Sequence, residues 1–359
     1  MDVTFSDEQR DLQAMVRDLL AREPAEGLGS AVWKRLSAEL GLTGIAVPEE
    51  HGGAGAGTVE LGIVLSELGR ALTPVPYLQT VVAGLVLSAT DAPAAAAALP
   101  AIAAGEVVAG LATPGGPAPE ATAAGDGLRL TGTLDNVVDG PHLGLLVTPA
   151  QLDGTEVLAL VWLQEPGVEV TALPTLDRTR PQARIALSGA AAAHIGDAAA
   201  ASRAVDLLLA AVAVESAGAA RFCLDETVRH LMTRVQFGRP IGTFQALQHR
   251  CADLAVLVEA ASSTAWYAMW AAGEGGAVDP VSGPLAKAYC ADAFRTVAGE
   301  MIQLHGGIGF TWEHPAHRYF KRATSTDLLF GGRSWVRALV ARRAGLAELK
   351  AGVPVGAWP

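Results

Sequence analysis

The sequence predicts an α+β protein in which a helical domain, a small β-domain and a four-helix bundle follow one another. The chain has 359 residues, enough for two or three folded units at roughly 150 residues per domain. Half of the residues are hydrophobic and 18% are charged, so a large core can be buried. The spacing of apolar residues changes from helical to strand-like near residue 106, and returns to helical near residue 198. We therefore expect domains at 1–107, 108–197 and 198–359.

The first domain is expected to be helical. Ser6 is followed three positions later by Gln9, which is the pattern of a capping box, and then by apolar residues at helical spacing as far as residue 22. Glycine and proline separate the later amphipathic segments. Helices are therefore expected at 6–22, 30–41, 58–72, 76–90 and 93–104.

The second domain is expected to be a small β-barrel or sandwich, because short apolar or alternating runs are divided there by turn residues. These runs predict strands at 107–111, 128–132, 143–147, 157–161 and 184–187. In the third domain, long segments of helical periodicity are joined by short loops, which is typical of a helical bundle. Its four helices are expected near 200–233, 243–273, 283–304 and 332–349.

Charge and hydropathy exclude several classes of protein. The net charge is −11 and no basic run is present, so neither nucleic acid nor an anionic membrane is an expected partner. The first residues are acidic and polar, unlike a signal peptide, and the longest apolar stretches fall well short of the roughly 20 residues that span a bilayer. We expect a cytoplasmic protein.

Two motifs that suggest cofactor or metal binding are set aside. The glycines of 306–309 follow a predicted helix rather than a strand, so they do not form the dinucleotide-binding fingerprint of a Rossmann fold. His314 and His317 have the spacing of a metal-binding pair, but the sequence offers no third ligand beside them, and the three cysteines are far apart. No metal site is expected.

Two segments of the third domain carry a family resemblance. The first is Arg234-Val235-Gln236-Phe237-Gly238-Arg239-Pro240-Ile241-Gly242-Thr243-Phe244-Gln245, followed by His249 and by Ala252-Asp253. The second is Gln303-Leu304-His305-Gly306-Gly307-Ile308-Gly309-Phe310-Thr311. Together they resemble the signature of the acyl-CoA dehydrogenases. This resemblance implies a tetrameric FAD enzyme that oxidises the α,β-bond of an acyl-CoA and passes electrons to an electron-transfer flavoprotein.

The resemblance also implies cofactor contacts. Cofactor-binding roles fall on Arg234, Gln236, Phe237, Gln303, His305, Gly306 and Gly307, where the family contacts an FAD held mainly by a neighbouring subunit. A guanidinium suits a diphosphate because its donors fork onto phosphate oxygens. In the middle domain, only Thr113 matches the family's flavin loop, and residues 136–140 depart from the family's flavin strand. Binding of the flavin ring by this chain is therefore in question.

The catalytic base is missing from both positions at which the family places a glutamate. One position is occupied by Phe330 and the other by Leu208, and neither side chain accepts a proton. Glu215 lies two helical turns beyond Leu208 and is the candidate for a relocated base, although a packed structural carboxylate is the other reading of it. Asp327 is a weaker candidate.

Three hypotheses follow. The leading one is a non-catalytic subunit that completes the FAD site of a catalytic paralogue, as in heterotetrameric members of the family that act on bulky acyl-CoAs such as sterol side chains. The second is a self-sufficient homomeric dehydrogenase with Glu215 as base. The third is a scaffold without flavin that binds acyl-CoA or protein.

Overall fold

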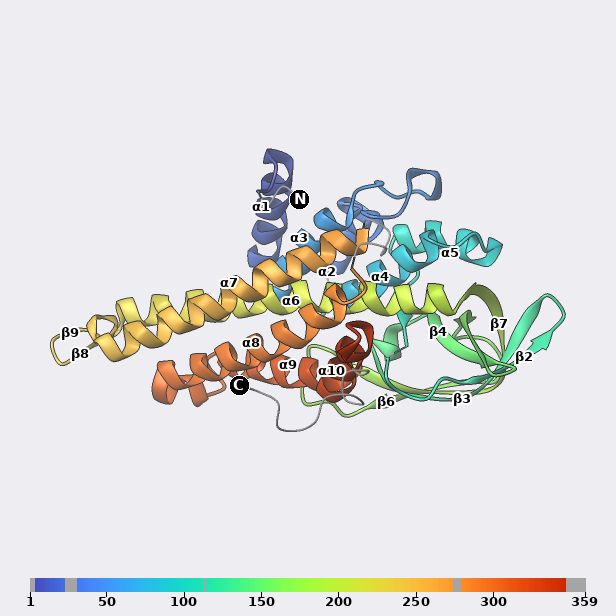
Figure 1. Ribbon diagram of the computed structural model, residues 1–359. Helices are drawn as coiled ribbons and strands as arrows, with labels where there is room; N and C mark the ends of the chain where they lie inside the picture. Colours follow the sequence, from blue (N-terminus) through green and yellow to red (C-terminus); the bar gives the residue numbers. More distant parts are fainter. Residues whose placement is uncertain (1–3, 23–30, 113, 274–278, 347–359) are drawn as a thin grey trace, which may run out of the picture.

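The computed structural model describes residues 4–22, 31–112, 114–273 and 279–346, and it places the β-domain at one end of a body of helices from the N-terminal and C-terminal parts (Figure 1). This arrangement confirms the predicted fold class. The helices of the first part are α1 (Asp7–Arg22), α2 (Ala31–Lys34), α3 (Thr58–Ala71), α4 (Tyr77–Ser88) and α5 (Pro93–Ala103). The predicted capping box is present, because Gln9 N donates to Ser6 Oγ at 3.2 Å and Ser6 N donates to Gln9 Oε1 at 3.0 Å.

The β-domain closes on itself. Strand β5 pairs with both β4 and β7, and β2 pairs with both β3 and β4, so that β2, β3, β7, β5 and β4 form a small barrel. The strands are β1 (Ala109–Leu111), β2 (Glu120–Ala124), β3 (Gly127–Val138), β4 (Leu145–Leu152), β5 (Thr155–Trp162), β6 (Val168–Leu173) and β7 (Gln182–Asp197). Strands β2 and β6 were not predicted because most of their side chains are exposed, which leaves no alternating apolar face in the sequence.

The C-terminal part is built around one long central helix. Helix α6 (Ala198–Thr233) packs against α7 (Gln245–Gly273) and α8 (Ser282–His305), and the two-stranded hairpin of β8 (Val235–Gln236) and β9 (Arg239–Pro240) follows it directly. Helix α9 (Ala316–Leu328) was not predicted, since polar residues dominate it. The helix expected at 332–349 is α10 (Gly332–Arg343), and positions 347–349 lie outside the described residues.

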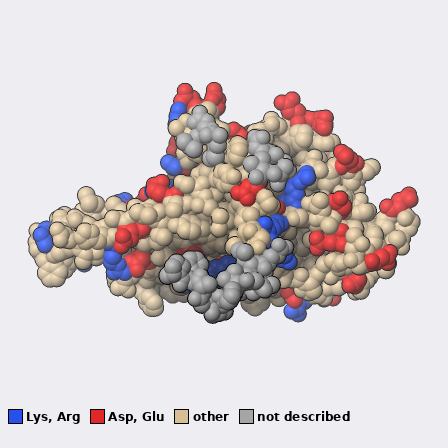
Figure 2. All heavy atoms as spheres, in the orientation of Figure 1, with Lys and Arg blue, Asp and Glu red and all other residues tan. Residues whose placement is uncertain are grey.

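Helix α6 is the only helix in the described residues that is long and apolar enough to cross a membrane, and 89% of its most apolar window is buried inside the protein. Its apolar character is therefore explained by its position between the N-terminal helices, the barrel and the bundle (Figure 1). On the face drawn in Figure 2, Asp and Glu gather over the right-hand end, where the barrel lies, while Lys and Arg are scattered.

Helices α3 and α6 touch through glycine. A Cβ atom added at Gly69 would lie 2.0 Å from the carbonyl oxygen of Glu215, and one added at Gly218 would lie 2.1 Å from that of Ser66. Both distances are far shorter than a van der Waals contact. These two glycines therefore fix how closely the N-terminal helices approach the bundle.

Replacement of one of these glycines tests the contact. We expect Gly218→Ala to lower the free energy of unfolding by about 1–3 kcal/mol, because the backbone of α3 has to move away from the new methyl group. Gly299→Ala on α8 is the control, since its Cβ would meet only Phe320 at 3.8 Å and alanine favours a helix by up to about 1 kcal/mol. Urea unfolding of the two variants measures the difference, and equal stability would contradict the close contact.

Candidate functional site

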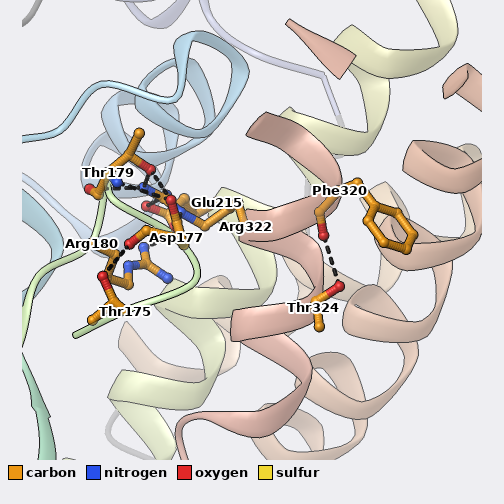
Figure 3. Close-up of polar contacts among 8 residues, drawn as sticks. All are labelled: Thr175, Asp177, Thr179, Arg180, Glu215, Phe320, Arg322 and Thr324. Carbon is orange, nitrogen blue, oxygen red and sulfur yellow. Dashed lines mark hydrogen bonds and ion pairs between the residues drawn. The ribbon is translucent and has the colours of Figure 1, made fainter. Parts of the chain in front are cut away.

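A cluster of buried charges surrounds Glu215 in the middle of α6 (Figure 3). Its Oε2 accepts a hydrogen bond from Nη2 of Arg180, and its Oε1 lies 3.3 Å from Nη1 of Arg322. Arg180 belongs to the loop between β6 and β7, and Arg322 belongs to α9. Both oxygens of Glu215 are therefore engaged by guanidinium groups from two other parts of the fold.

Asp177 holds the other side of Arg322. Its Oδ2 accepts from Nε of Arg322, and its Oδ1 accepts from Thr179 N at 2.9 Å and from the Thr179 hydroxyl at 2.5 Å. Burial alone would raise the pKa of Asp177, but Arg322, Thr179 and Arg180 outweigh it and hold that pKa below its usual value. The stability supplied by ionised Asp177 is therefore present above the carboxyl's unfolded pKa, near 4, and is lost as the pH falls below it.

Both positions at which the family places its base are apolar and buried. Leu208 lies in α6 and Phe330 follows α9, with the guanidinium of Arg180 lying 5.5 Å from the centre of the Phe330 ring. Phe330 also has a φ of +54°, a left-handed conformation that is unusual for an aromatic residue. The weaker candidate, Asp327, accepts two hydrogen bonds from Arg333.

Asp139 is the acid in this region that is closest to titrating at neutral pH. It follows β3, and burial raises its pKa to about 7, against the lowering effect of Arg180 and Arg322. It borders a cavity of about 530 Å³, which also has Asp177, Thr179, Trp312 and Lys321 in its wall. The carboxyl group of Asp139 can therefore exchange a proton near pH 7.

The loop that corresponds to the family's flavin loop packs against the turn after α9. A Cβ atom on Gly115 would lie 3.1 Å from Cα of Gly331 and 3.1 Å from the Trp335 ring. A cavity of about 440 Å³ borders this contact, and Pro114, Trp335 and Arg343 are among the residues that line it. Thr113, the expected flavin-ring contact, lies outside the described residues.

The hairpin after α6 presents three of the expected cofactor residues to solvent. Arg234, Gln236 and Phe237 are all exposed, and Phe237 is 90% exposed. Phe237 and Gly238 form the two-residue turn with φ values of +53° and +75°, as in the type I′ turns that join tight hairpins. Arg234 makes no ion pair with any described residue.

Some residues of the second motif, 303–311, are exposed and others are buried. Gln303, Gly306 and Gly307 are exposed, and Cβ atoms added at the two glycines would meet nothing within 4 Å. His305 is buried instead, with its ring 4.3 Å from that of His230 and 4.2 Å from that of His314. The expected cofactor role of His305 therefore does not match the direction in which its side chain points.

The structure also separates the two histidines of the His-x-x-His motif. His314 faces His305 and lies within 4.0 Å of Glu226, whereas the His317 ring packs against Trp312 at 4.7 Å. This grouping could not be predicted from the sequence, because Glu226 is distant from His314 in the chain.

The residues that sequence reasoning missed are Asp177, Arg180 and Arg322. For Asp177 and Arg180, the only indication in the sequence was the charged run at 177–180 inside a strand-rich region. Nothing in the sequence indicated that this run contacts Arg322 of α9. Glu215 was recognised, but its arginine partners were not.

Comparison with known proteins agrees with this architecture. The family model described as the acyl-CoA dehydrogenase N-terminal domain matches residues 6–106, and the C-terminal domain model matches residues 198–345. The chain is 36% identical to the acyl-CoA dehydrogenase IpdE2 of Mycobacterium tuberculosis over 327 residues, which cover 91% of this chain and 90% of the relative. The chain belongs to the acyl-CoA dehydrogenase family.

Solved structures of the family superpose over almost the whole chain. A steroid acyl-CoA dehydrogenase, the Tcur3481-Tcur3483 G363A variant, has a TM-score of 0.88 at 30% identity and covers 97% of this chain and 99% of its own. The ChsE4-ChsE5 complex of Mycobacterium tuberculosis has a TM-score of 0.88 at 29% identity and covers 99% and 100%. Acyl-CoA dehydrogenases are FAD-binding oxidoreductases of lipid metabolism, so FAD is the cofactor of this chain's family.

The buried ion pairs generate a stability prediction. Arg322→Met keeps an apolar stem but leaves Asp177 without its guanidinium, and we expect it to lower the free energy of unfolding by about 3–5 kcal/mol. Arg184→Met is the control, because Arg184 pairs with Asp135 at the surface and such pairs contribute about 1 kcal/mol or less. Urea unfolding at pH 7 measures both, and a similar small loss in each variant would show that the buried cluster is not structural.

Proposed function

We propose that this chain is the non-catalytic subunit of a heteromeric acyl-CoA dehydrogenase and completes the FAD site of a catalytic paralogue. The reaction is α,β-dehydrogenation of an acyl-CoA thioester. The observation that carries the proposal is a contrast between two sets of residues. The base positions, Leu208 and Phe330, have no carboxylate, whereas the motif residues that contact a neighbouring subunit's cofactor in this family are present and exposed.

Removal of the α-proton requires a base with a free lone pair that faces the substrate. Leu208 and Phe330 have none, and both are buried. Both carboxylate oxygens of Glu215 are bound to arginine side chains. Among the described residues, Glu215 does not line any of the five cavities considered. In this proposal the base is supplied by the paralogue.

The exposed motif residues fit a contact with FAD held by the paralogue. FAD supplies the hydride acceptor of this reaction when it is bound. On this chain, Arg234 forms no ion pair with the described residues, so it can offer its guanidinium to the pyrophosphate. Gly306 and Gly307 leave room for close approach of the backbone. Gln236, Phe237 and Gln303 line the same end of the bundle, and Thr113 would be the one contact from this chain's own flavin loop.

The partner and substrate are proposed from the relatives. One structural relative is a steroid acyl-CoA dehydrogenase, and another is the ChsE4-ChsE5 complex. We infer that this chain also assembles with a paralogous subunit, as a cytoplasmic heterotetramer, and acts on a bulky, steroid-like acyl-CoA. An electron-transfer flavoprotein is the proposed electron acceptor.

Co-expression tests the subunit role. We expect the chain alone to be colourless and unable to oxidise acyl-CoA with an artificial acceptor. Together with a paralogue that carries a base glutamate, we expect a yellow complex with fewer than one FAD per chain and measurable turnover. A yellow and active preparation of the chain alone would overturn the proposal, and absence of FAD from every co-expressed complex would favour the scaffold without flavin.

Glu215→Gln in the same complex separates the leading proposal from the self-sufficient enzyme. If Glu215 were the base, the variant would keep FAD and lose turnover by about two to four orders of magnitude. If the ion pair is structural, the folded fraction falls but each folded complex keeps its turnover. Turnover divided by the concentration of bound FAD distinguishes these results, because it counts only folded complexes that hold the cofactor.

The cofactor contact generates a further prediction. Arg234→Ala should weaken FAD binding to the complex by about 10- to 100-fold, because it removes a charge-assisted hydrogen bond worth about 1.5–3 kcal/mol. Activity should recover with excess FAD, since no catalytic group is touched. Arg203→Ala is the control: Arg203 is also an exposed arginine of α6, about 45 Å away along the helix. Unchanged FAD affinity in Arg234→Ala would remove this residue from the cofactor site.

A further inference from the structure

A group of metal-ligand side chains lies at the end of the bundle that carries the hairpin. Glu226 of α6, His305 at the end of α8 and His314 before α9 place one ligand atom each within 4.8 Å of one another. These three residues come from three separate segments of the C-terminal part. We call them the Glu226–His305–His314 cluster.

His305 has the hydrogen bonding of a histidine prepared for a metal ion. Its Nδ1 lies 2.7 Å from the carbonyl oxygen of Met301, so that Nδ1 carries the proton and donates it. Its Nε2 is therefore a lone-pair acceptor, and this atom is buried without a hydrogen-bond partner. A backbone carbonyl that fixes the tautomer in this way is the usual outer partner of a metal-binding imidazole. The orphaned nitrogen needs a ligand, because a buried polar atom without a partner is costly.

The two other members face the same point. His314 Nε2 lies 4.0 Å from Oε1 of Glu226. Arg229 donates to both oxygens of that carboxylate, from Nη2 to Oε1 and from Nε to Oε2, so a cation would bind beside this ion pair. The Ala316 amide donates to His314 Nδ1 at 3.2 Å. Binding of a cation through Nε2 requires the His314 proton on Nδ1, which can then no longer accept from the Ala316 amide, so this hydrogen bond is lost on binding.

We propose that Glu226, His305 and His314 bind one divalent transition-metal ion, with Zn²⁺ as the expected species. Two imidazole nitrogens and one carboxylate oxygen are ligands that Zn²⁺ takes in proteins, and a water molecule completes the tetrahedron. Mg²⁺ and Ca²⁺ prefer all-oxygen sites, so they are not expected to bind here. This site is independent of the proposed subunit role, because none of its ligands is needed for the FAD contacts of Arg234, Gln303, Gly306 or Gly307.

The position of the site gives it a structural effect. The ion would link α6, α8 and the segment before α9. The turn of Gly306–Phe310 lies between the last two of these, so its ends would be held in place. The exposed hairpin starts next to the same end of α6. Metal binding would therefore hold in place the surface that the chain offers to a partner subunit, and it would add stability in proportion to the metal concentration.

Metal uptake by the full-length chain tests the proposal. Protein stripped with a chelator is titrated with Zn²⁺ or Co²⁺, and bound metal is measured by elemental analysis and calorimetry, with Mg²⁺ as the negative control. We expect one equivalent of Zn²⁺, a melting temperature that rises with Zn²⁺, and the visible absorption of tetrahedral Co²⁺. His305→Ala and His314→Ala should each weaken binding by at least about 100-fold.

His317→Ala is the matched control, because His317 lies three residues from His314 but packs against Trp312. It should bind Zn²⁺ as the wild type does. The circular dichroism of each variant is recorded without metal, so that a folding defect is separated from a lost ligand; should His305→Ala not fold, Glu226→Gln takes its place. Absence of stoichiometric Zn²⁺ uptake by the wild type, or equal uptake by the His305 and His317 variants, would overturn the proposal.

Discussion

The buried ion pairs among Asp177, Arg180, Glu215 and Arg322 join the parts of this fold. They connect the loop between β6 and β7 to the central helix α6 and to α9 (Figure 3). Two carboxylates and two guanidiniums removed from water are stable only when each is paired and hydrogen-bonded. These ion pairs hold the loop, and with it the barrel, against the bundle, although Arg180 Nη1 is buried with no hydrogen-bond partner among the described residues.

The same cluster lies beside the contact between α3 and α6. Glu215 lies where Gly69 brings α3 against α6, and Arg180 covers the ring of Phe330. Contacts at the centre of α6 therefore hold the three parts of the fold together. The exposed motif residues lie at the far end of that helix, where Arg234 and Phe237 project from the hairpin. One helix therefore carries buried ion pairs in its middle and is followed by exposed motif residues at its end.

The end of the bundle has an interior as well as a surface. The His305 ring stacks on His230 and meets the ring of His314 at a tilt of 43°. This arrangement explains why a motif that resembles a cofactor-binding signature is only partly exposed. Its glutamine and glycines face outward, whereas its histidine belongs to a buried cluster with Glu226.

The sequence by itself determined the order of helical, β and helical parts, since hydrophobic periodicity reports local structure directly. It also determined the capping box of Ser6 and Gln9 and the family, because these depend on residue identity at known spacings. It did not determine β2, β6 or α9, whose exposed or polar side chains carry little periodic signal. Only the tertiary structure decided the partners of Glu215, the inward direction of His305 and the separation of His314 from His317. Each of these depends on contacts between residues far apart in the chain, and a single sequence records which side chains are present but not which of them meet.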